Sequence, residues 1–361
     1  MRRNSRECPA DLTLPRPRPR SGDDFPGADT PCYTRLGGGT IWTGRRIDLG
    51  GYRSASPVQW PVKEEGGVSE PIAFGKTGLE VSQLGIGTAA LGDLKLSETE
   101  ADHILRGALD AGISLIDTAR SYGVAEARVG RIIAGRRNKI VLSTKVGYGI
   151  PGEPDWTGSC VTKGVEAALR AMRTDWIDIV HLHSCPVQTL QQRGVVESLH
   201  RAQQMGKIRV AAYSGDNEAL DWAISSGAFG SVQFSLNPVD QRSIDRALPV
   251  ATRRGMGILT KRSLGNAPWM DTSEPVEPDR KTYWDRFKRM RLENGGMSWA
   301  ELFLRFALAT SGVHCVLFGA RTLAHLNECT QAASRGPLPK DLHAAIRAAF
   351  HVNDANWNGV V

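Results

Sequence analysis

Four residues that could together move a proton lie at the ends of three apolar runs in this sequence. Asp117 and Tyr122 follow one run, Lys145 ends the next, and His183 ends a third. A phenol is a weak acid with an ordinary pKa of about 10, and a buried ammonium beside it lowers that pKa. A carboxylate keeps the amine charged, and an imidazole can orient a carbonyl oxygen so that the phenol protonates it. The four side chains therefore predict a site for carbonyl reduction, provided that a hydride donor lies opposite them.

These residues belong to a regular alternation of strand-like runs and amphipathic helical patterns. The expected strands are residues 84–89, 114–119, 140–146, 177–183, 210–215, 231–237, 257–262 and 314–320. Eight strand–helix units predict a (β/α)8 TIM barrel, which typically takes about 250 residues. The catalytic groups of such a barrel lie at the C-terminal ends of its strands, which is where the four residues stand.

Two rival interpretations are weaker. A doubly wound sheet would need a G-x-G-x-x-G turn, and the run from Gly85 to Ala90 lacks the third glycine. His181 and His183 point to the same face of their strand and raise the alternative of a metal-dependent hydrolase. A catalytic metal needs at least three protein ligands, and the other histidines fall in helical patterns, near the C-terminus or at the wrong end of a strand. We therefore predict no metal site, and a core position for His181.

The first 67 residues differ from the rest in composition. They hold 8 of the 19 prolines and 10 of the 39 glycines and show no apolar periodicity. Such a segment cannot offset the entropy of ordering, so we expect residues 1–67 to form a disordered Pro/Gly/Arg-rich tail. Residues 68–361 are expected to form the barrel, with a short N-terminal hairpin at 71–82.

Composition also excludes several classes of partner. The net charge of +7 is spread along the chain without a basic run interleaved with aromatics, so no nucleic acid is expected. No stretch reaches 18 uninterrupted apolar residues, so no membrane span is expected. The sequence shows neither a secretory leader nor a C-x-x-C pair, which predicts a cytoplasmic protein with reduced thiols. We expect a monomer or a weak oligomer.

The motif Asp117-Thr-Ala-x-x-Tyr122-Gly-x-x-Glu126, followed by Thr144-Lys145 and by Asp178-x-x-x-x-His183, resembles the aldo-keto reductase family. The resemblance extends from about residue 71 to residue 350. It implies that Tyr122 is the general acid/base and that Lys145 lowers its pKa. It also implies that Asp117 is the partner of Lys145 and that His183 orients the carbonyl.

The resemblance further implies that a nicotinamide dinucleotide lies across the barrel mouth. Ser214 and Gln233 match the residues that hold the carboxamide. The loop over the nicotinamide and pyrophosphate corresponds to Lys261, Arg262, Ser263, Leu264 and Gly265. The adenosine phosphate and adenine site corresponds to Gly319, Arg321, His325 and Glu328. Four positions depart from the common pattern: Gly215 and Cys329 where asparagine is common, Lys261 where an aromatic is common, and His325 where arginine is common. Asp216 or Asn217 could supply the missing amide contact, and Arg262 could stack in place of the aromatic.

Cofactor choice is predicted from Arg321. It follows the last strand at the start of a helix, where backbone donors favour anions and a guanidinium can grip a phosphate. No acidic residue stands in that loop to accept the 2′-hydroxyl of NADH, so NADPH is expected, with NADH as the alternative.

The substrate is expected to be a small carbonyl compound or a sugar. The enzyme would reduce aldehydes or ketones, or oxidise the corresponding alcohols or aldoses in the reverse direction. The walls of its pocket are expected in loops 147–160 and 264–297, where the aromatic residues either form an apolar or sugar-stacking surface or simply pack within the loops. These aromatic residues are Tyr148, Trp156, Trp269, Tyr283 and Trp284. The alternative function is a dinucleotide-binding regulatory subunit with little turnover.

Overall fold

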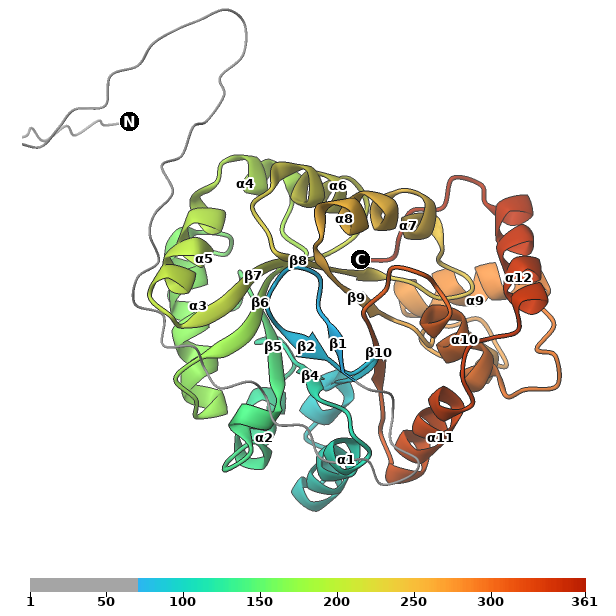
Figure 1. Ribbon diagram of the computed structural model, residues 1–361, viewed down its shortest axis with the longest axis horizontal. Helices are drawn as coiled ribbons and strands as arrows, with labels where there is room; N and C mark the ends of the chain where they lie inside the picture. The colour runs from blue at the N-terminus through green and yellow to red at the C-terminus, as the bar shows by residue number, and fades with distance from the viewer. Residues whose placement is uncertain (1–70) are drawn as a thin grey trace, which may run out of the picture. The chain divides into compact units, whose positions relative to one another are not determined.

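Eight parallel strands close into a barrel in the computed structural model, which describes residues 71–361 (Figure 1). The expected tail at 1–67 and the boundary before residue 68 lie outside the described residues and stay predictions. The barrel strands are β3 (Leu84–Gly87), β4 (Leu115–Asp117), β5 (Val141–Val146), β6 (Ile177–His183), β7 (Ile208–Ser214), β8 (Ser231–Ser235), β9 (Gly257–Lys261) and β10 (Cys315–Gly319). They follow chain order around the barrel, and β10 pairs with β3 to close it. The predicted TIM barrel is confirmed, with several strands shorter than expected.

Helices alternate with the strands and cover the outside of the barrel (Figure 1). Those that alternate with the barrel strands are α1 (Glu98–Asp110), α2 (Ala125–Ile132), α3 (Gly158–Met172), α5 (Gly194–Gln204), α6 (Asn217–Ser226), α8 (Ala247–Arg254), α10 (Trp299–Leu308) and α11 (Leu323–Ser334). Four more helices lie in or after the loops: α4 (Val187–Gln191), α7 (Arg242–Asp245), α9 (Pro278–Met290) and α12 (Lys340–Asn353). Short 3-10 turns are η1 (Ala89–Gly92), η2 (Arg137–Lys139) and η3 (Pro268–Met270). Among residues 71–361, no helix is both long and apolar enough to span a membrane.

The predicted hairpin is present and closes one end of the barrel. Strands β1 (Ile72–Ala73) and β2 (Glu80–Val81) pair antiparallel and lie across the barrel in the foreground of Figure 1. Phe74 and Val81 are fully buried in one apolar cluster with Leu115 and Val141 from the starts of barrel strands. Because the hairpin plugs the N-terminal end, the interior of the barrel can open only at the C-terminal ends of the strands.

The loop between β3 and α1 lies directly on the segment that carries Tyr122. The buried guanidinium of Arg128 donates to the carbonyls of Leu91 (2.6 Å), Asp93 (3.1 Å) and Leu96 (2.6 Å), and so fixes the course of this loop. Gly92 then approaches Tyr122 so closely that a β-carbon at position 92 would lie 2.0 Å from the Tyr122 carbonyl oxygen. A residue without a side chain is therefore required there.

We predict that Gly92→Ala lowers the free energy of unfolding by about 1–3 kcal/mol, the usual range for overpacking against groups that cannot move away. Urea unfolding measures this. Gly194→Ala is the matched control, because no atom lies within 4 Å of a β-carbon at that position. We expect it to be neutral or to stabilise the fold by less than about 1 kcal/mol. Equal losses from both substitutions would contradict the close packing of the loop on Tyr122.

Candidate active site

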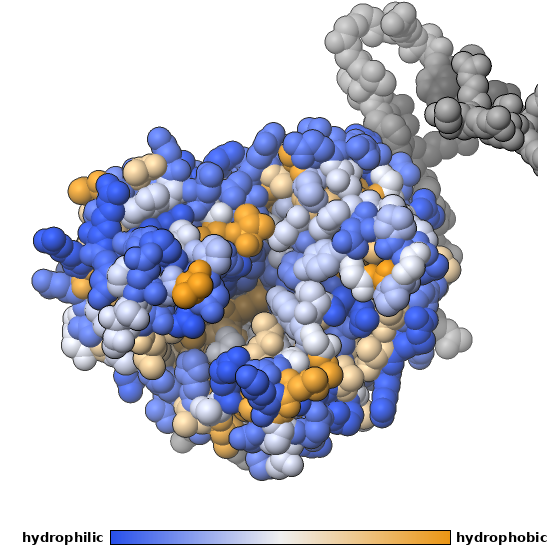
Figure 2. Space-filling view, turned by 180° about the vertical axis from the view of Figure 1, so that it is seen from behind, coloured by the Kyte–Doolittle hydropathy of each residue, from blue (hydrophilic) through white to orange (hydrophobic). Residues whose placement is uncertain are grey.

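The face opposite the hairpin is hollowed at its centre, as Figure 2 shows from behind the view of Figure 1. The C-terminal ends of the barrel strands meet there. Several of these ends carry polar residues that the sequence singled out, among them Asp117 on β4, Lys145 on β5, His183 on β6 and Ser214 on β7. Tyr122 follows β4 in the adjoining loop.

A buried ion pair lies at the C-terminal ends of β4 and β5. The Nζ atom of Lys145 is 2.5 Å from Oδ2 of Asp117 and donates to the carbonyl of Thr118 at 2.8 Å. Both charged side chains are almost fully buried. Burial is the largest influence on the pKa of Lys145 and lowers it, but Asp117 and then Tyr122 oppose it, so that the pKa lies above its ordinary value. The amine therefore stays charged.

The second oxygen of the same carboxylate links the ion pair to β8. Oδ1 of Asp117 accepts from Ser143 Oγ at 2.8 Å and from Gln233 Nε2 at 3.1 Å. Gln233 in turn accepts from Ser214 Oγ at 2.7 Å. The predicted carboxamide pair, Ser214 and Gln233, thus belongs to one buried network with Asp117 and Lys145.

Tyr122 and His183 complete a tetrad with Asp117 and Lys145. The Lys145 Nζ atom lies 4.9 Å from the centre of the Tyr122 ring, and the Tyr122 and His183 rings meet edge to face at 6.0 Å. Burial, followed by the nearby charges of Lys145 and Lys261, lowers the pKa of His183 to about 2. Its imidazole is therefore neutral at physiological pH, with one nitrogen that donates and one that accepts.

The other histidine of β6 has a different environment. His181 is fully buried, with Nε2 at 3.1 Å from Ser143 Oγ, and burial lowers its pKa to about 4. It lies in the core, as expected. Within residues 71–361, no three side chains of the metal-ligating types are grouped to hold a metal ion.

Two further cations stand beside the tetrad at the end of β9. Lys261 pairs with the buried Asp216 at 2.7 Å, and Arg262 pairs with Asp279 at 2.8 Å. Both cations help to lower the pKa of His183, which places their charges near its ring. The Nη1 atom of Arg262 is buried without a partner. Asp216 is therefore committed to Lys261, and its proposed role as a substitute amide contact has no support in this arrangement.

The rest of the predicted loop after β9 shapes the backbone. Ser263 donates from Oγ to the carbonyl of Leu317 at 2.5 Å, and Leu264 packs against the main core. Gly265 donates its N–H to the carbonyl of Arg262 at 2.8 Å, which closes a tight turn. These contacts hold the loop against β10.

The predicted adenosine residues lie at the end of β10 and the start of α11. Gly319 ends the strand, His325 donates its backbone N–H to the capping Thr322, and Glu328 accepts from Ser298 Oγ at 3.2 Å. The side chain of Arg321 is 71% exposed and lies 3.6 Å from Asp93.

The loop that carries Arg321 has no acidic residue of its own, and the carboxylate beside Arg321 comes from a distant segment of the chain. Asp93 comes from the loop between β3 and α1, more than two hundred positions earlier in the chain. The local sequence around Arg321 could not reveal it.

Of the five aromatic residues expected to line the pocket, two lie at the tetrad. Tyr148 places its hydroxyl 2.8 Å from Nδ1 of His183, and Trp156 packs against the Tyr148 ring at 5.5 Å. The other three are occupied elsewhere: Tyr283 is fully buried and donates to Asp240, Trp269 packs on Phe303, and Trp284 donates to the Asp271 carbonyl. Of the two alternatives for Tyr283, the structure supports packing, because its ring belongs to the core.

Sequence reasoning also missed a C-terminal strap, residues 357–361, which crosses the ends of β7 and β8. The side chain of Asn217 exchanges two hydrogen bonds with the backbone of Gly359, at 3.0 and 2.8 Å. The carbonyl of Val360 accepts from Ser235 Oγ at 2.9 Å, and its N–H donates to Asp240 at 3.1 Å. Asn217 is therefore engaged by the strap, so the structure does not support its proposed role as a substitute amide contact. No local pattern in the sequence signals these distant pairings.

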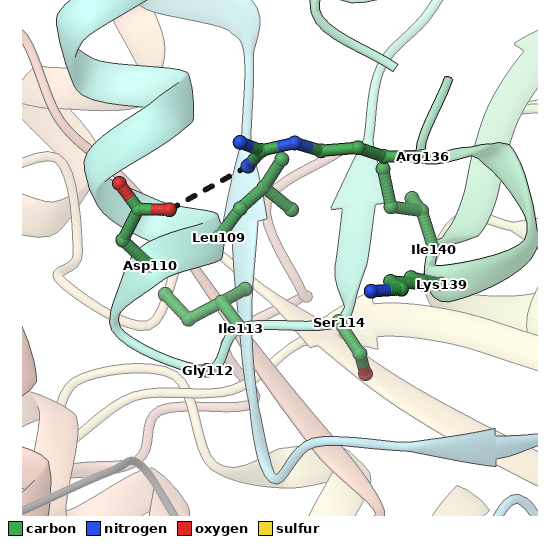
Figure 3. Close-up of a pocket in the computed structure, with 8 residues that line it drawn as sticks. All are labelled: Leu109, Asp110, Gly112, Ile113, Ser114, Arg136, Lys139 and Ile140. Carbon is green, nitrogen blue, oxygen red and sulfur yellow. Dashed lines mark ion pairs between the residues drawn. The ribbon is translucent and has the colours of Figure 1, made fainter. Parts of the chain in front are cut away.

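A separate hollow of about 380 Å³ lies between the end of α1 and η2, near the start of β4 (Figure 3). Arg136 and Asp110 form an ion pair of 3.5 Å across it. Its lining residues are Leu109, Asp110, Gly112, Ile113, Ser114, Arg136, Lys139 and Ile140. None of the tetrad residues is among them, so this hollow is distinct from the candidate active site.

Comparison with known proteins agrees with this geometry. The model of the Aldo/keto reductase family matches residues 83–350. The chain belongs to the aldo-keto reductase family. It is therefore an oxidoreductase, of a family that generally binds NAD(P)H and acts on small carbonyl or sugar substrates.

Individual relatives are distant but span most of the chain. An L-galactose dehydrogenase from Arabidopsis thaliana is 24% identical over 73% of this chain and 87% of its own length. A D-threo-aldose 1-dehydrogenase from a Pseudomonas species is 25% identical over 78% of this chain and 97% of its own length. An aldo-keto reductase from Bacillus halodurans superposes with a TM-score of 0.68 at 24% identity, over 78% of this chain and 96% of the other, and shares the fold.

The depressed pKa of His183 makes stability depend on pH. The unfolded chain binds a proton at this residue below its ordinary pKa of about 6.5, whereas the folded chain stays neutral down to about 2. Stability from this group is therefore fully present above pH 6.5 and is lost as the pH falls below it, by about 1.4 kcal/mol per pH unit.

We predict that His183→Gln lowers the slope of unfolding free energy against pH by about this amount between pH 5.5 and pH 4.5. Urea unfolding of both proteins over this range gives the two slopes. Identical slopes would show that His183 is not buried as a neutral ring.

Proposed function

We propose that this enzyme transfers a hydride between NAD(P)H and a small carbonyl compound or sugar, with Tyr122 as the general acid/base. The observation that carries the proposal is the position of the Tyr122 ring beside the buried ammonium of Lys145, whose charge Asp117 maintains. A cation next to a phenol favours the phenolate and so makes proton release easier. The bound nicotinamide supplies or accepts the hydride.

Each member of the tetrad has a separate task in this scheme. Tyr122 gives its proton to the carbonyl oxygen during reduction and recovers one from the alcohol during oxidation. Lys145 places its positive charge beside the phenol ring, and Asp117 with the Thr118 carbonyl fixes the ammonium in place. The neutral ring of His183 offers one N–H donor to the reacting oxygen.

The residues at the mouth fit the chemistry of a nicotinamide dinucleotide. The Ser214 hydroxyl and the Gln233 amide would hold the carboxamide, because together they offer both donors and acceptors. Arg262 retains a buried N–H without a partner, which suits an anionic oxygen. The remaining residues proposed to contact the cofactor are Lys261, Ser263, Leu264, Gly265, Gly319, Arg321, His325 and Glu328.

The preferred cofactor is proposed to be NADPH, with NADH as the alternative. The exposed guanidinium of Arg321 can turn toward a 2′-phosphate and form two parallel hydrogen bonds. Asp93 tempers this preference, since a neighbouring carboxylate both competes for Arg321 and can accept a ribose hydroxyl.

A small carbonyl compound or sugar suits the two rings beside His183. Tyr148 and Trp156 provide flat apolar surfaces next to the reacting groups. The names of the L-galactose and D-threo-aldose dehydrogenases support sugars as the first class to test. A panel of aldehydes, ketones and aldoses, followed at the nicotinamide absorbance band, tests the activity directly.

The regulatory alternative, a dinucleotide-binding subunit with little turnover, is less well supported because all four tetrad residues meet at one site. Tight dinucleotide binding with no turnover across the panel would favour it. A monomeric or weakly oligomeric state and a cytoplasmic location stay predictions.

We predict that Tyr122→Phe lowers turnover by about 10²- to 10⁴-fold, because it removes the transferred proton and keeps the ring. Dinucleotide affinity and the unfolding midpoint should hardly change. The matched control is Tyr213→Phe, which removes a phenol hydroxyl whose hydrogen bond goes to the Cys185 carbonyl at 3.2 Å and not to a tetrad residue. Full turnover in the Tyr122 variant would remove this residue from the reaction.

A second prediction concerns cofactor choice. Arg321→Ala should weaken NADPH binding by about 1–2 kcal/mol, the lower part of the range for a charged hydrogen bond, because the side chain is well exposed. NADH binding should change little, and it serves as the internal control. Fluorescence titration gives both dissociation constants. Equal weakening of the two cofactors would place the 2′-phosphate elsewhere.

A further inference from the structure

Tyr148 is held in a fixed place beside the tetrad. It follows β5 after Gly147, whose φ of +134° lies in a region that side chains disfavour. The Trp156 ring covers Gly147 so closely that a β-carbon there would lie 2.2 Å from it. The same Trp156 donates its backbone N–H to the Gly147 carbonyl at 2.7 Å and packs on the Tyr148 ring. The loop therefore presents the phenol to His183 with little freedom.

The Tyr148 hydroxyl has two neighbours and a single proton. It lies 2.8 Å from Nδ1 of His183 and 3.3 Å from Oγ of Ser121. The ring nitrogen is the closer partner, and an unprotonated imidazole nitrogen is a stronger acceptor than a serine hydroxyl. The hydroxyl of Ser121 can rotate and donate its own proton to the phenol oxygen. This arrangement satisfies all three groups when Tyr148 donates to His183.

We propose that Tyr148 is a positioning residue that donates its proton to Nδ1 of His183 and so keeps the proton of the neutral ring on Nε2. The inference rests on the proposed function, because it concerns how His183 meets the reacting oxygen. A neutral imidazole carries one proton, so the bond at Nδ1 decides the state of Nε2. With the proton on Nε2, the ring donates to a carbonyl oxygen. The other tautomer would turn a lone pair toward the lone pairs of that oxygen.

Tyr148 therefore has a task distinct from that of Tyr122. Tyr122 exchanges its proton with the substrate, whereas Tyr148 keeps its proton and acts through the imidazole. Its removal should weaken the orientation of the carbonyl and leave proton transfer by Tyr122 available. The expected loss is correspondingly smaller, about 3- to 15-fold in turnover, as for one neutral hydrogen bond.

The test is nitrogen NMR of the histidine rings in the full-length chain, without cofactor or substrate, together with turnover. Loss of one set of signals in His183→Gln assigns that ring. In the wild type we expect Nε2 of His183 to be protonated and Nδ1 to be an acceptor. Tyr148→Phe keeps the stacked ring and should give a mixture of tautomers, with the 3- to 15-fold loss of turnover and unchanged dinucleotide affinity.

Ser121→Ala is the matched control for the direction of the bond. If Tyr148 donates to His183, this variant keeps the wild-type tautomer and loses less turnover than Tyr148→Phe. If the phenol proton belonged to Ser121, its removal would free that proton for Nδ1 and switch the tautomer.

A protonated Nδ1 in the wild type, an unchanged ring in Tyr148→Phe or a switch in Ser121→Ala would each overturn the proposal. Because the NMR experiment needs no turnover, its result stays readable even if the proposed reaction fails.

Discussion

The buried pair of Lys145 and Asp117 is the interaction on which the site depends. Two charges removed from water stabilise a structure only when close contact and further hydrogen bonds replace their hydration. Here the ammonium has the carboxylate and the Thr118 carbonyl, while the carboxylate also receives Ser143 and Gln233. These partners come from β4, β5 and β8, so the pair is satisfied only when the barrel has closed. The same closure that completes the core completes the catalytic charge arrangement.

The two ends of the barrel have different roles: the N-terminal end contributes to stability, and the C-terminal end holds the candidate active site. At the N-terminal end, the hairpin and the first residues of the strands form a sealed apolar cluster. At the C-terminal end, polar residues follow the strands, and the strap at 357–361 crosses the ends of β7 and β8. The loop carrying Gly92 lies against the backbone of Tyr122, held by the buried Arg128. The position of the phenol is therefore set by packing that lies outside the tetrad itself.

Each of three cations at the C-terminal end of the barrel forms an ion pair with a carboxylate. Lys145, Lys261 and Arg262 each pair with a carboxylate, yet their combined field still reaches His183. Together with burial, that field keeps the imidazole neutral. What matters for its hydrogen bond to the substrate is therefore which ring nitrogen carries the proton, and not the charge of the ring. We propose that the contact with Tyr148 sets which of the two nitrogens is protonated. The neutral ring and the second phenol are thus two parts of one arrangement.

The barrel architecture and the order of the tetrad residues along the chain could be predicted from local sequence patterns. Apolar runs of strand length alternate with helical patterns, and this alternation by itself predicts a barrel. Because parallel strands in a closed barrel end on the same side, residues at successive strand ends must converge, and Asp117, Lys145 and His183 do so. The resemblance to the family rested on the same strand-end residues. These features could be predicted because they depend on neighbours in the chain and on a topology with few alternatives.

Tertiary structure alone decided the contacts between distant segments. Three such contacts are the bond between Tyr148 and His183, the strap on Asn217 and the approach of Asp93 to Arg321. Each joins segments that are far apart in the chain, so no repeating pattern in the sequence reveals it. Tyr283, on α9, shows the same limit, since the sequence alone does not tell whether an aromatic residue forms a pocket wall or belongs to the core. Side-chain packing selects between such outcomes through close contacts and buried hydrogen bonds. Those contacts exist only after the strands have brought their loops together.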